Sequence, residues 1–131
     1  MKLSNLLLGA TTLALLTFPA FAAGEPPDLK TMVINGQTVI TDAKGMTLYT
    51  FDKDKPGEAS TCADKCAAAW PPAYASAGAA PSGDFTLVKS ADGKDMWAYK
   101  GMALYGFVKD LKPGDTAGDM VGKVWHTAVE K

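Results

Sequence analysis

The chain has 131 residues, of which 13 are Lys or Arg and 14 are Asp or Glu, so its formal net charge at pH 7 is −1. No Arg is present, and no run of Lys forms a polybasic segment. Nucleic-acid-binding proteins depend on basic patches and on Arg in particular, and binding to anionic membrane surfaces depends on polybasic segments. The composition therefore excludes nucleic acid as a partner and argues against an anionic membrane surface.

Residues 1–22 are typical of a secretory signal peptide. A basic start at Lys2 precedes an apolar stretch from Leu6 to Phe18, and small residues surround Ala22. The apolar stretch is shorter than the roughly 20 residues of a membrane-spanning helix. We therefore predict cleavage near Ala22, export to the periplasm or beyond it, and a soluble mature chain without a membrane span. Residues 23–30 are predicted to be a flexible leader.

A β-hairpin and a third strand are predicted next. Two β-branched runs, residues 31–34 and 37–40, flank Asn35-Gly36. This dipeptide is the strongest local signal for a hairpin, because both central positions of the tight turn need a positive φ. A strand over residues 46–51 completes a three-stranded antiparallel meander.

The second half of the chain repeats this plan. Residues 101–110 match residues 45–54 at seven of ten positions, which indicates an internal duplication. Strands are predicted over residues 85–89, 95–99 and 102–108. Each half is thus expected to be one meander.

Residues 31–131 are predicted to form a single β domain, with repeat one over 31–72, a linker over 73–83 and repeat two over 84–131. In the third strand of each repeat, a leucine is expected on one face and the following tyrosine on the other, since side chains alternate along a strand. Both faces carry apolar residues, so both are expected to be covered. The predicted fold class is mainly β, with two three-stranded antiparallel meanders that share one core.

A short helix is predicted over residues 61–70, which are rich in Ala and precede two prolines. Thr61 is the candidate N-cap. The helix carries Cys62 and Cys66, the two cysteines of the chain. A last strand is predicted over residues 123–129.

The cysteine pair has two interpretations. An even number of cysteines in an exported protein favours a disulfide between Cys62 and Cys66. Side chains four residues apart in a helix have Cβ atoms about 5–6 Å apart, whereas a disulfide needs about 3.5–4.5 Å, so the bond would distort or end the helix. Alternatively, soft thiolates would bind copper(I) or carry out redox chemistry, with Met46, Met102 and His126 as additional ligands.

Both repeats contain the pattern Tyr-x-aromatic-x-x-Asp. Its members are Tyr49, Phe51 and Asp54 in repeat one and Tyr105, Phe107 and Asp110 in repeat two. The pattern resembles that of a bacterial secreted-repeat family, the predicted lipoproteins with a conserved Tyr-x-(Phe/Trp/Tyr)-x-x-Asp motif. The resemblance implies an envelope or surface location and no assigned activity. The chain has no cysteine at the predicted cleavage site, so a lipid anchor is not implied.

The aspartates of the motif also have two interpretations. Asp52, Asp54 and Asp110 would supply carboxylate oxygens to a hard cation such as calcium. Alternatively, each motif aspartate accepts hydrogen bonds from turn N–H groups or from a tyrosine hydroxyl and fixes the end of a strand. Their duplication in equivalent positions favours this structural role.

No catalytic set is indicated, because the one histidine, His126, has no recognisable nucleophile beside it in the sequence. The leading hypothesis is an exported, noncatalytic binding or envelope-associated module, whose partner is an envelope component or a small ligand. One alternative is a periplasmic redox or copper-handling protein that uses Cys62 and Cys66. The other is a small hydrolase with an unidentified site.

Overall fold

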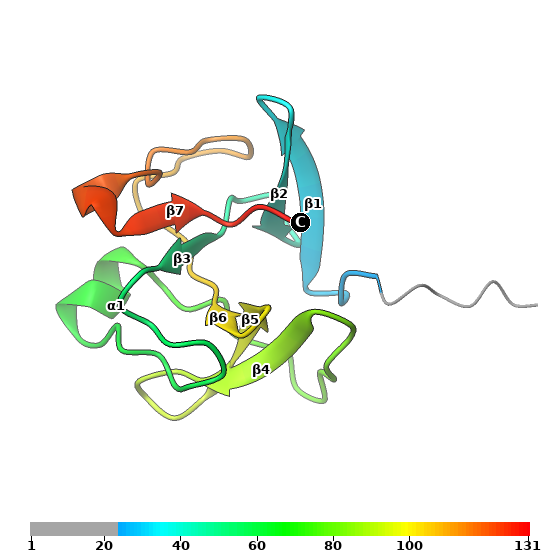
Figure 1. The fold of residues 1–131 in the computed structure, drawn as a ribbon, viewed down its shortest axis with the longest axis vertical. Coiled ribbons are helices and arrows are strands. Elements are labelled where there is room, and N and C mark those ends of the chain that lie inside the picture. The colour runs from blue at the N-terminus through cyan, green and yellow to red at the C-terminus, as the bar shows by residue number, and fades with distance from the viewer. Residues whose placement is uncertain (1–23) are drawn as a thin grey trace, which may run out of the picture.

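The computed structural model describes residues 24–131, which form a mainly β structure with two short helical segments (Figure 1). The predicted signal peptide and the first residue of the predicted leader lie outside the described residues. Within the described part, no helix is long and apolar enough to cross a membrane.

The N-terminal hairpin consists of strands β1 (Leu29–Ile34) and β2 (Gln37–Asp42), which pair antiparallel. Asn35 and Gly36 form the turn with φ values of 51° and 78°. The predicted hairpin is therefore confirmed, together with the positive φ angles that its turn requires. Strand β1 begins two residues before the predicted domain boundary at residue 31.

The second repeat contains a three-stranded antiparallel sheet in the order β4, β5, β6. Strands β4 (Phe85–Lys89) and β5 (Asp95–Tyr99) have the predicted bounds, whereas β6 covers only Met102–Ala103. Leu104 still pairs with the sheet through a hydrogen bond from its N–H to the carbonyl of Trp97, at 2.9 Å. The chain then leaves this sheet, so the predicted strand over 102–108 is shortened.

The predicted strand over residues 46–51 is divided between two partners. Its first part pairs with β2, because Leu48 donates to the carbonyl of Ile40 at 3.0 Å and Thr47 forms a bridge with Thr41. Its second part is β3 (Tyr49–Phe51), which pairs antiparallel with β7 (Trp125–Thr127) from the second repeat. The two repeats are therefore joined by main-chain pairing, as Figure 1 shows for β3 and β7.

The cysteine-bearing helix α1 is shorter than predicted and covers Lys65–Ala69. Asp64 occupies the N-cap position with a φ of 55° and makes no side-chain cap. The prediction of Thr61 as N-cap is wrong, because its hydroxyl and its N–H are both bonded to the carboxylate of Asp54. A single 3-10 turn, η1 (Val121–Lys123), precedes β7.

Two apolar clusters fill the described part of the chain, and each contains residues from both repeats. Leu48 and Leu104 belong to one cluster, whereas Tyr49 and Tyr105 belong to the other. All four side chains are buried. The alternation of leucine and tyrosine between opposite faces follows the two-residue period of a strand.

Candidate functional site

The tyrosines and aspartates of the two motif copies are hydrogen-bonded across the repeats. The hydroxyl of Tyr49 donates to Oδ2 of Asp110 at 2.6 Å, and the hydroxyl of Tyr105 donates to Oδ2 of Asp54. The main chains of the two tyrosines also exchange N–H···O bonds with each other, at 2.7 and 2.9 Å. This reciprocal exchange is the pattern that a two-fold relation between the repeats produces.

The second oxygen of each motif carboxylate is bonded within its own repeat. Oδ1 of Asp54 accepts from the N–H and the hydroxyl of Thr61, at 2.9 and 2.6 Å. Oδ1 of Asp110 accepts from the N–H of Ala117 at 2.8 Å. Each aspartate thus fixes the segment seven residues after it and, at the same time, the tyrosine of the other repeat. Both carboxylates are buried, and hydrogen bonds to the charged form offset the cost of that burial.

Each of the two tyrosine hydroxyls makes one further hydrogen bond. The N–H of Gly118 donates to the hydroxyl of Tyr49 at 3.2 Å, and the hydroxyls of Ser60 and Tyr105 lie 2.6 Å apart. Burial, reinforced by the aspartate beside each hydroxyl, raises the pKa of both tyrosines above the ordinary value. Both phenols therefore remain neutral hydrogen-bond donors well above physiological pH.

A stack of four aromatic rings lies beside these pairs. Trp70 and Trp125 are stacked with centroids 3.8 Å apart and an interplanar angle of 4°. Phe107 stacks on the outer side of Trp70 at 4.0 Å, and Phe51 on that of Trp125 at 4.2 Å. Successive rings, in the order Phe51, Trp125, Trp70 and Phe107, therefore come alternately from repeat one and repeat two. Gly118 is required here, because a Cβ at this position would lie 2.8 Å from the Trp70 ring.

The structure thus brings all six predicted motif residues into one centre, and their polar groups are engaged with one another or with the main chain. The proposed calcium set is not assembled as a ligand cluster. Among the described residues, no group of three His, Cys, Asp or Glu side chains is placed to hold a metal ion. Asp52 instead bonds to His126, with 2.8 Å between Oδ2 and Nε2. Sequence reasoning missed this pair because its members are 74 residues apart.

Cys62 and Cys66 form a disulfide with a Cα–Cα distance of 5.2 Å. Helix α1 begins only at Lys65, so the bond links the buried Cys62 ahead of the helix to its first turn. This agrees with the expectation that a disulfide over this spacing is incompatible with an uninterrupted helix. No cysteine in the described part of the chain is free.

The methionines and the histidine proposed as copper ligands line different hollows from the one that Cys62 lines. Met46 lines a hollow of about 330 Å³, whereas Met102 and His126 line a different one of about 420 Å³. Cys62 lines a third, smaller hollow of about 180 Å³. The combined set of cysteines, methionines and histidine is therefore not brought together around a single hollow.

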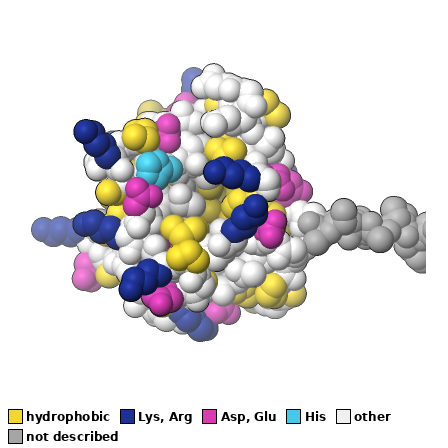
Figure 2. Space-filling model, viewed as in Figure 1, with side chains coloured by type: hydrophobic (Ala, Val, Ile, Leu, Met, Phe, Trp, Pro, Cys, Tyr) yellow, Lys and Arg dark blue, Asp and Glu magenta, His cyan; other side chains and the backbone are white. Residues whose placement is uncertain are grey.

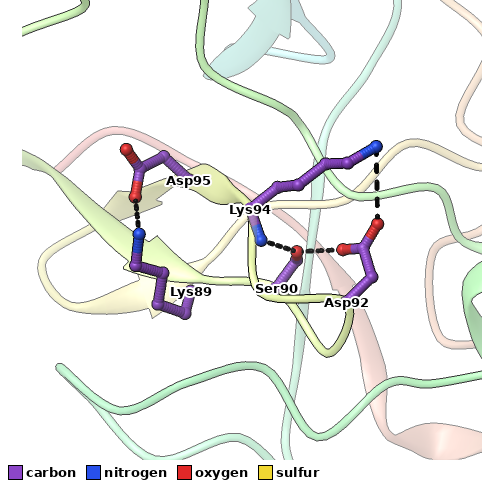
Figure 3. Close-up of polar contacts among 5 residues, drawn as sticks. All are labelled: Lys89, Ser90, Asp92, Lys94 and Asp95. Carbon is purple, nitrogen blue, oxygen red and sulfur yellow. Dashed lines mark hydrogen bonds and ion pairs between the residues drawn. The ribbon is translucent and has the colours of Figure 1, made fainter.

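The turn between β4 and β5 forms a further polar cluster (Figure 3). The buried hydroxyl of Ser90 donates to the carboxylate of Asp92 and accepts from the N–H of Lys94 at 3.0 Å. Asp92 also accepts from the hydroxyl of Tyr74 at 3.1 Å. At the base of the turn, Lys89 and Asp95 form a surface ion pair at 2.7 Å. Exposed ion pairs of this kind contribute little to stability. The bonds of the Ser90 hydroxyl to Asp92 and Lys94 are local, so their effect is to shape the turn.

A protein-family model described as a secreted repeat of unknown function matches residues 33–74 and, a second time, residues 86–129. The two matches correspond to the two halves that carry the motif. No curated protein and no solved structure matches the chain.

Proposed function

Because the chain belongs to a family of secreted repeats of unknown function, we propose that it is an exported, noncatalytic module that binds its ligand at the surface of a rigid two-repeat scaffold. Export follows the signal-peptide pattern of residues 1–22, and the family description supports it. The mature protein then begins near Ala23. Its site of action is the periplasm or the outer face of the envelope.

The reciprocal tyrosine–aspartate pairs are the observation that carries the proposal. Asp54 and Asp110 are the buried carboxylates of the described residues, and both have their oxygens bonded to a tyrosine and to a turn. A general acid or base must be free to exchange a proton with a substrate. Groups bonded in this way instead hold two segments in register, so the motif supports the fold and leaves binding to the surface.

The surface offers concave sites that suit small ligands. Four hollows among the described residues have volumes of about 330 to 760 Å³ and combine apolar side chains with a few polar groups. Ligand sites commonly fall in this size range and have this character. The disulfide and the paired motifs hold the surrounding loops in place, which reduces the ordering cost of binding.

Native mass spectrometry of protein purified from the exported fraction tests the proposal, with the same sample denatured as the control. We expect a chain that starts near Ala23, carries the disulfide and retains a stoichiometric noncovalent ligand under native conditions alone. In parallel, the protein is assayed against nitrophenyl esters and glycosides, beside the variant Asp54→Asn. Turnover by the natural chain that this variant loses while remaining folded would refute a noncatalytic role.

A further inference from the structure

One hollow combines an open carboxylate oxygen with apolar walls, and from it we propose that the protein binds a small organic cation, an ammonium group attached to an apolar body. This hollow, which we call the Asp42 hollow, has a volume of about 330 Å³. Asp28 and Asp42 are the charged residues of its lining. The inference rests on the proposed binding function and names the ligand class and the site.

The N-terminal hairpin and the second repeat both contribute to the Asp42 hollow. Leu29 of β1 and Asp42 of β2 are paired in register, so their side chains project from the same face of the hairpin. The lining continues with Trp97 of β5, with residues 71–74 and with residues 106–108. Main-chain hydrogen bonds join these last two segments to each other and join residues 71–74 to β5. The walls of the hollow are thus fixed by the sheet structure.

Asp42 has one oxygen that a ligand can use. Its Oδ1 accepts from the N–H groups of Lys44 and Met46, at 2.9 and 3.0 Å, which fixes the orientation of the carboxylate. Within residues 24–131, its Oδ2 accepts no hydrogen bond. An ammonium group that donates to Oδ2 therefore forms a charge-assisted hydrogen bond without displacing a donor of the described chain.

Asp28 adds a second negative charge to the lining. Its carboxylate accepts from the N–H and the hydroxyl of Ser76 and, at 2.9 Å, from Nε1 of Trp97. Partial burial acts against ionisation, but these hydrogen bonds lower the pKa of Asp28 below its ordinary value. The donors are neutral groups, so they stabilise the carboxylate without cancelling its charge.

Neither carboxylate is neutralised at short range by a cation of the described chain. The three ion pairs among residues 24–131 use Asp52, Asp92 and Asp95 instead. Lys94 lies 5.4 Å from the centroid of the Tyr74 ring, which lines the hollow, but this ammonium group is paired with Asp92, as Figure 3 shows. An ammonium ligand at Asp42 therefore replaces no ion pair of the described chain.

The lysines that neighbour lining residues in the sequence stay outside the hollow. Lys30, next to Leu29, projects to the opposite face of β1, because side chains alternate along a strand. Lys44 and Lys109 are exposed and form no ion pair within the described residues. Figure 2 shows basic and acidic side chains interspersed over one face of the molecule. Selectivity for a cation is therefore expected from contact with Asp42 and not from the field of the whole surface.

The rest of the lining is mostly apolar and sets the second requirement. Leu48 and Trp97 are buried at the hollow, Phe107 is partly exposed and Val108 is exposed. Burial of apolar ligand surface against such side chains is favourable at roughly 25 cal/mol per Å². A hard metal cation takes about six or more oxygen ligands, and no group of three candidate metal ligands is assembled among the described residues. The expected ligand therefore joins an ammonium group to an apolar body.

Two-dimensional NMR titrations of the protein lacking residues 1–22 test the inference with benzylamine, benzoate and benzyl alcohol. The three probes share one ring and differ in charge. We expect benzylamine to shift the amide signals around the Asp42 hollow and to bind at least fivefold more tightly there than the other two. Comparable binding by benzoate or benzyl alcohol in this hollow would overturn the inference, as would benzylamine shifts centred on another hollow.

Two variants locate the contact. In Asp42→Asn, the amide oxygen still accepts from the N–H groups of Lys44 and Met46, so the turn is kept while the charge is lost. This change should weaken benzylamine binding about three- to fivefold, the effect of one exposed charge pair. Asp84→Asn removes the same charge from an exposed residue outside the lining and should leave the affinity unchanged. Equal effects of the two variants would indicate only a general charge effect and would overturn the site.

The outcome also separates this inference from the proposed function on which it rests. If the native protein retains a noncovalent ligand but benzylamine causes no shift, the cation inference fails while the binding function stands. If benzylamine binds at the Asp42 hollow and Asp42→Asn weakens it, the ligand class is supported even where the purified protein carries no ligand.

Discussion

Removal of the Tyr49 hydroxyl tests whether the cross-repeat pairs hold the fold together. In Tyr49→Phe, the carboxylate of Asp110 loses its donor at 2.6 Å, and the N–H of Gly118 loses its acceptor. A buried hydrogen bond to a charged group contributes about 1.5–3 kcal/mol. We therefore expect the free energy of unfolding to fall by about 2–3 kcal/mol, a large part of the stability of a small domain.

Urea denaturation followed by tryptophan fluorescence measures this loss. With a denaturant slope of about 1.5 kcal/mol per molar, the midpoint should fall by about 1–2 M. The control is Tyr74→Phe, which removes a hydroxyl bonded to Asp92 from a side chain that is 45% exposed. This change should cost less than about 0.5 kcal/mol.

A double-mutant cycle with Tyr49→Phe and Asp110→Asn isolates the pair itself. Residues in direct contact show interaction energies of about 0.5–3 kcal/mol. We expect a value in the upper half of that range, since both groups are buried. Additive losses in the double variant, or equal losses in the Tyr49 and Tyr74 variants, would refute the view that the cross-repeat bond stabilises the fold.

Three further predictions concern the same centre and the residues around it. Folding raises the pKa of both motif tyrosines above the value of about 10 that they have in the unfolded chain. The free energy of unfolding should therefore keep its full value below about pH 10 and should fall above it, by up to about 1.4 kcal/mol per pH unit for each tyrosine. A urea midpoint that does not change between pH 9 and 11 would contradict this. Thr47→Val should raise the free energy of unfolding by about 1 kcal/mol in the same assay, since the buried Thr47 hydroxyl has no hydrogen-bond partner among residues 24–131. A loss of stability would show that the hydroxyl has a partner. Gly118→Ala should lower the melting temperature through a clash costing about 1–3 kcal/mol. Gly106→Ala should have little effect, because among the described residues other than its chain neighbours the nearest atom to its Cβ would be the carbonyl oxygen of Pro71, at 3.9 Å. Equal shifts of the melting temperature in the two variants would exclude the clash.

Local signals in the sequence predicted the parts of the fold that depend on local chemistry. Asn35-Gly36 specifies its turn by backbone conformation alone, and the hairpin around it has the expected bounds on the turn side. Strands 85–89 and 95–99 follow from alternation and from the intervening glycine turn. These features need no information about distant segments.

Features that depend on distant segments were not predictable in the same way. The repeat shows two tyrosines and two aspartates in equivalent positions, but sequence does not state which tyrosine meets which aspartate. The division of residues 46–51 between β2 and β7 depends on where the second repeat lies. Thr61 fits the local rule for an N-cap, yet the buried carboxylate of Asp54 competes for its hydroxyl and offers a stronger, charged acceptor.

The exchanged hydrogen bonds also describe a self-complementary surface. Each repeat presents one tyrosine that needs an aspartate and one aspartate that needs a tyrosine, and the other repeat supplies both. Two identical, unlinked copies of such a unit would satisfy one another in the same way, as in an isologous dimer. The present chain has the geometry of such a dimer, with the two units joined by the peptide chain. A substitution of a motif tyrosine or aspartate therefore removes a hydrogen bond from the opposite repeat.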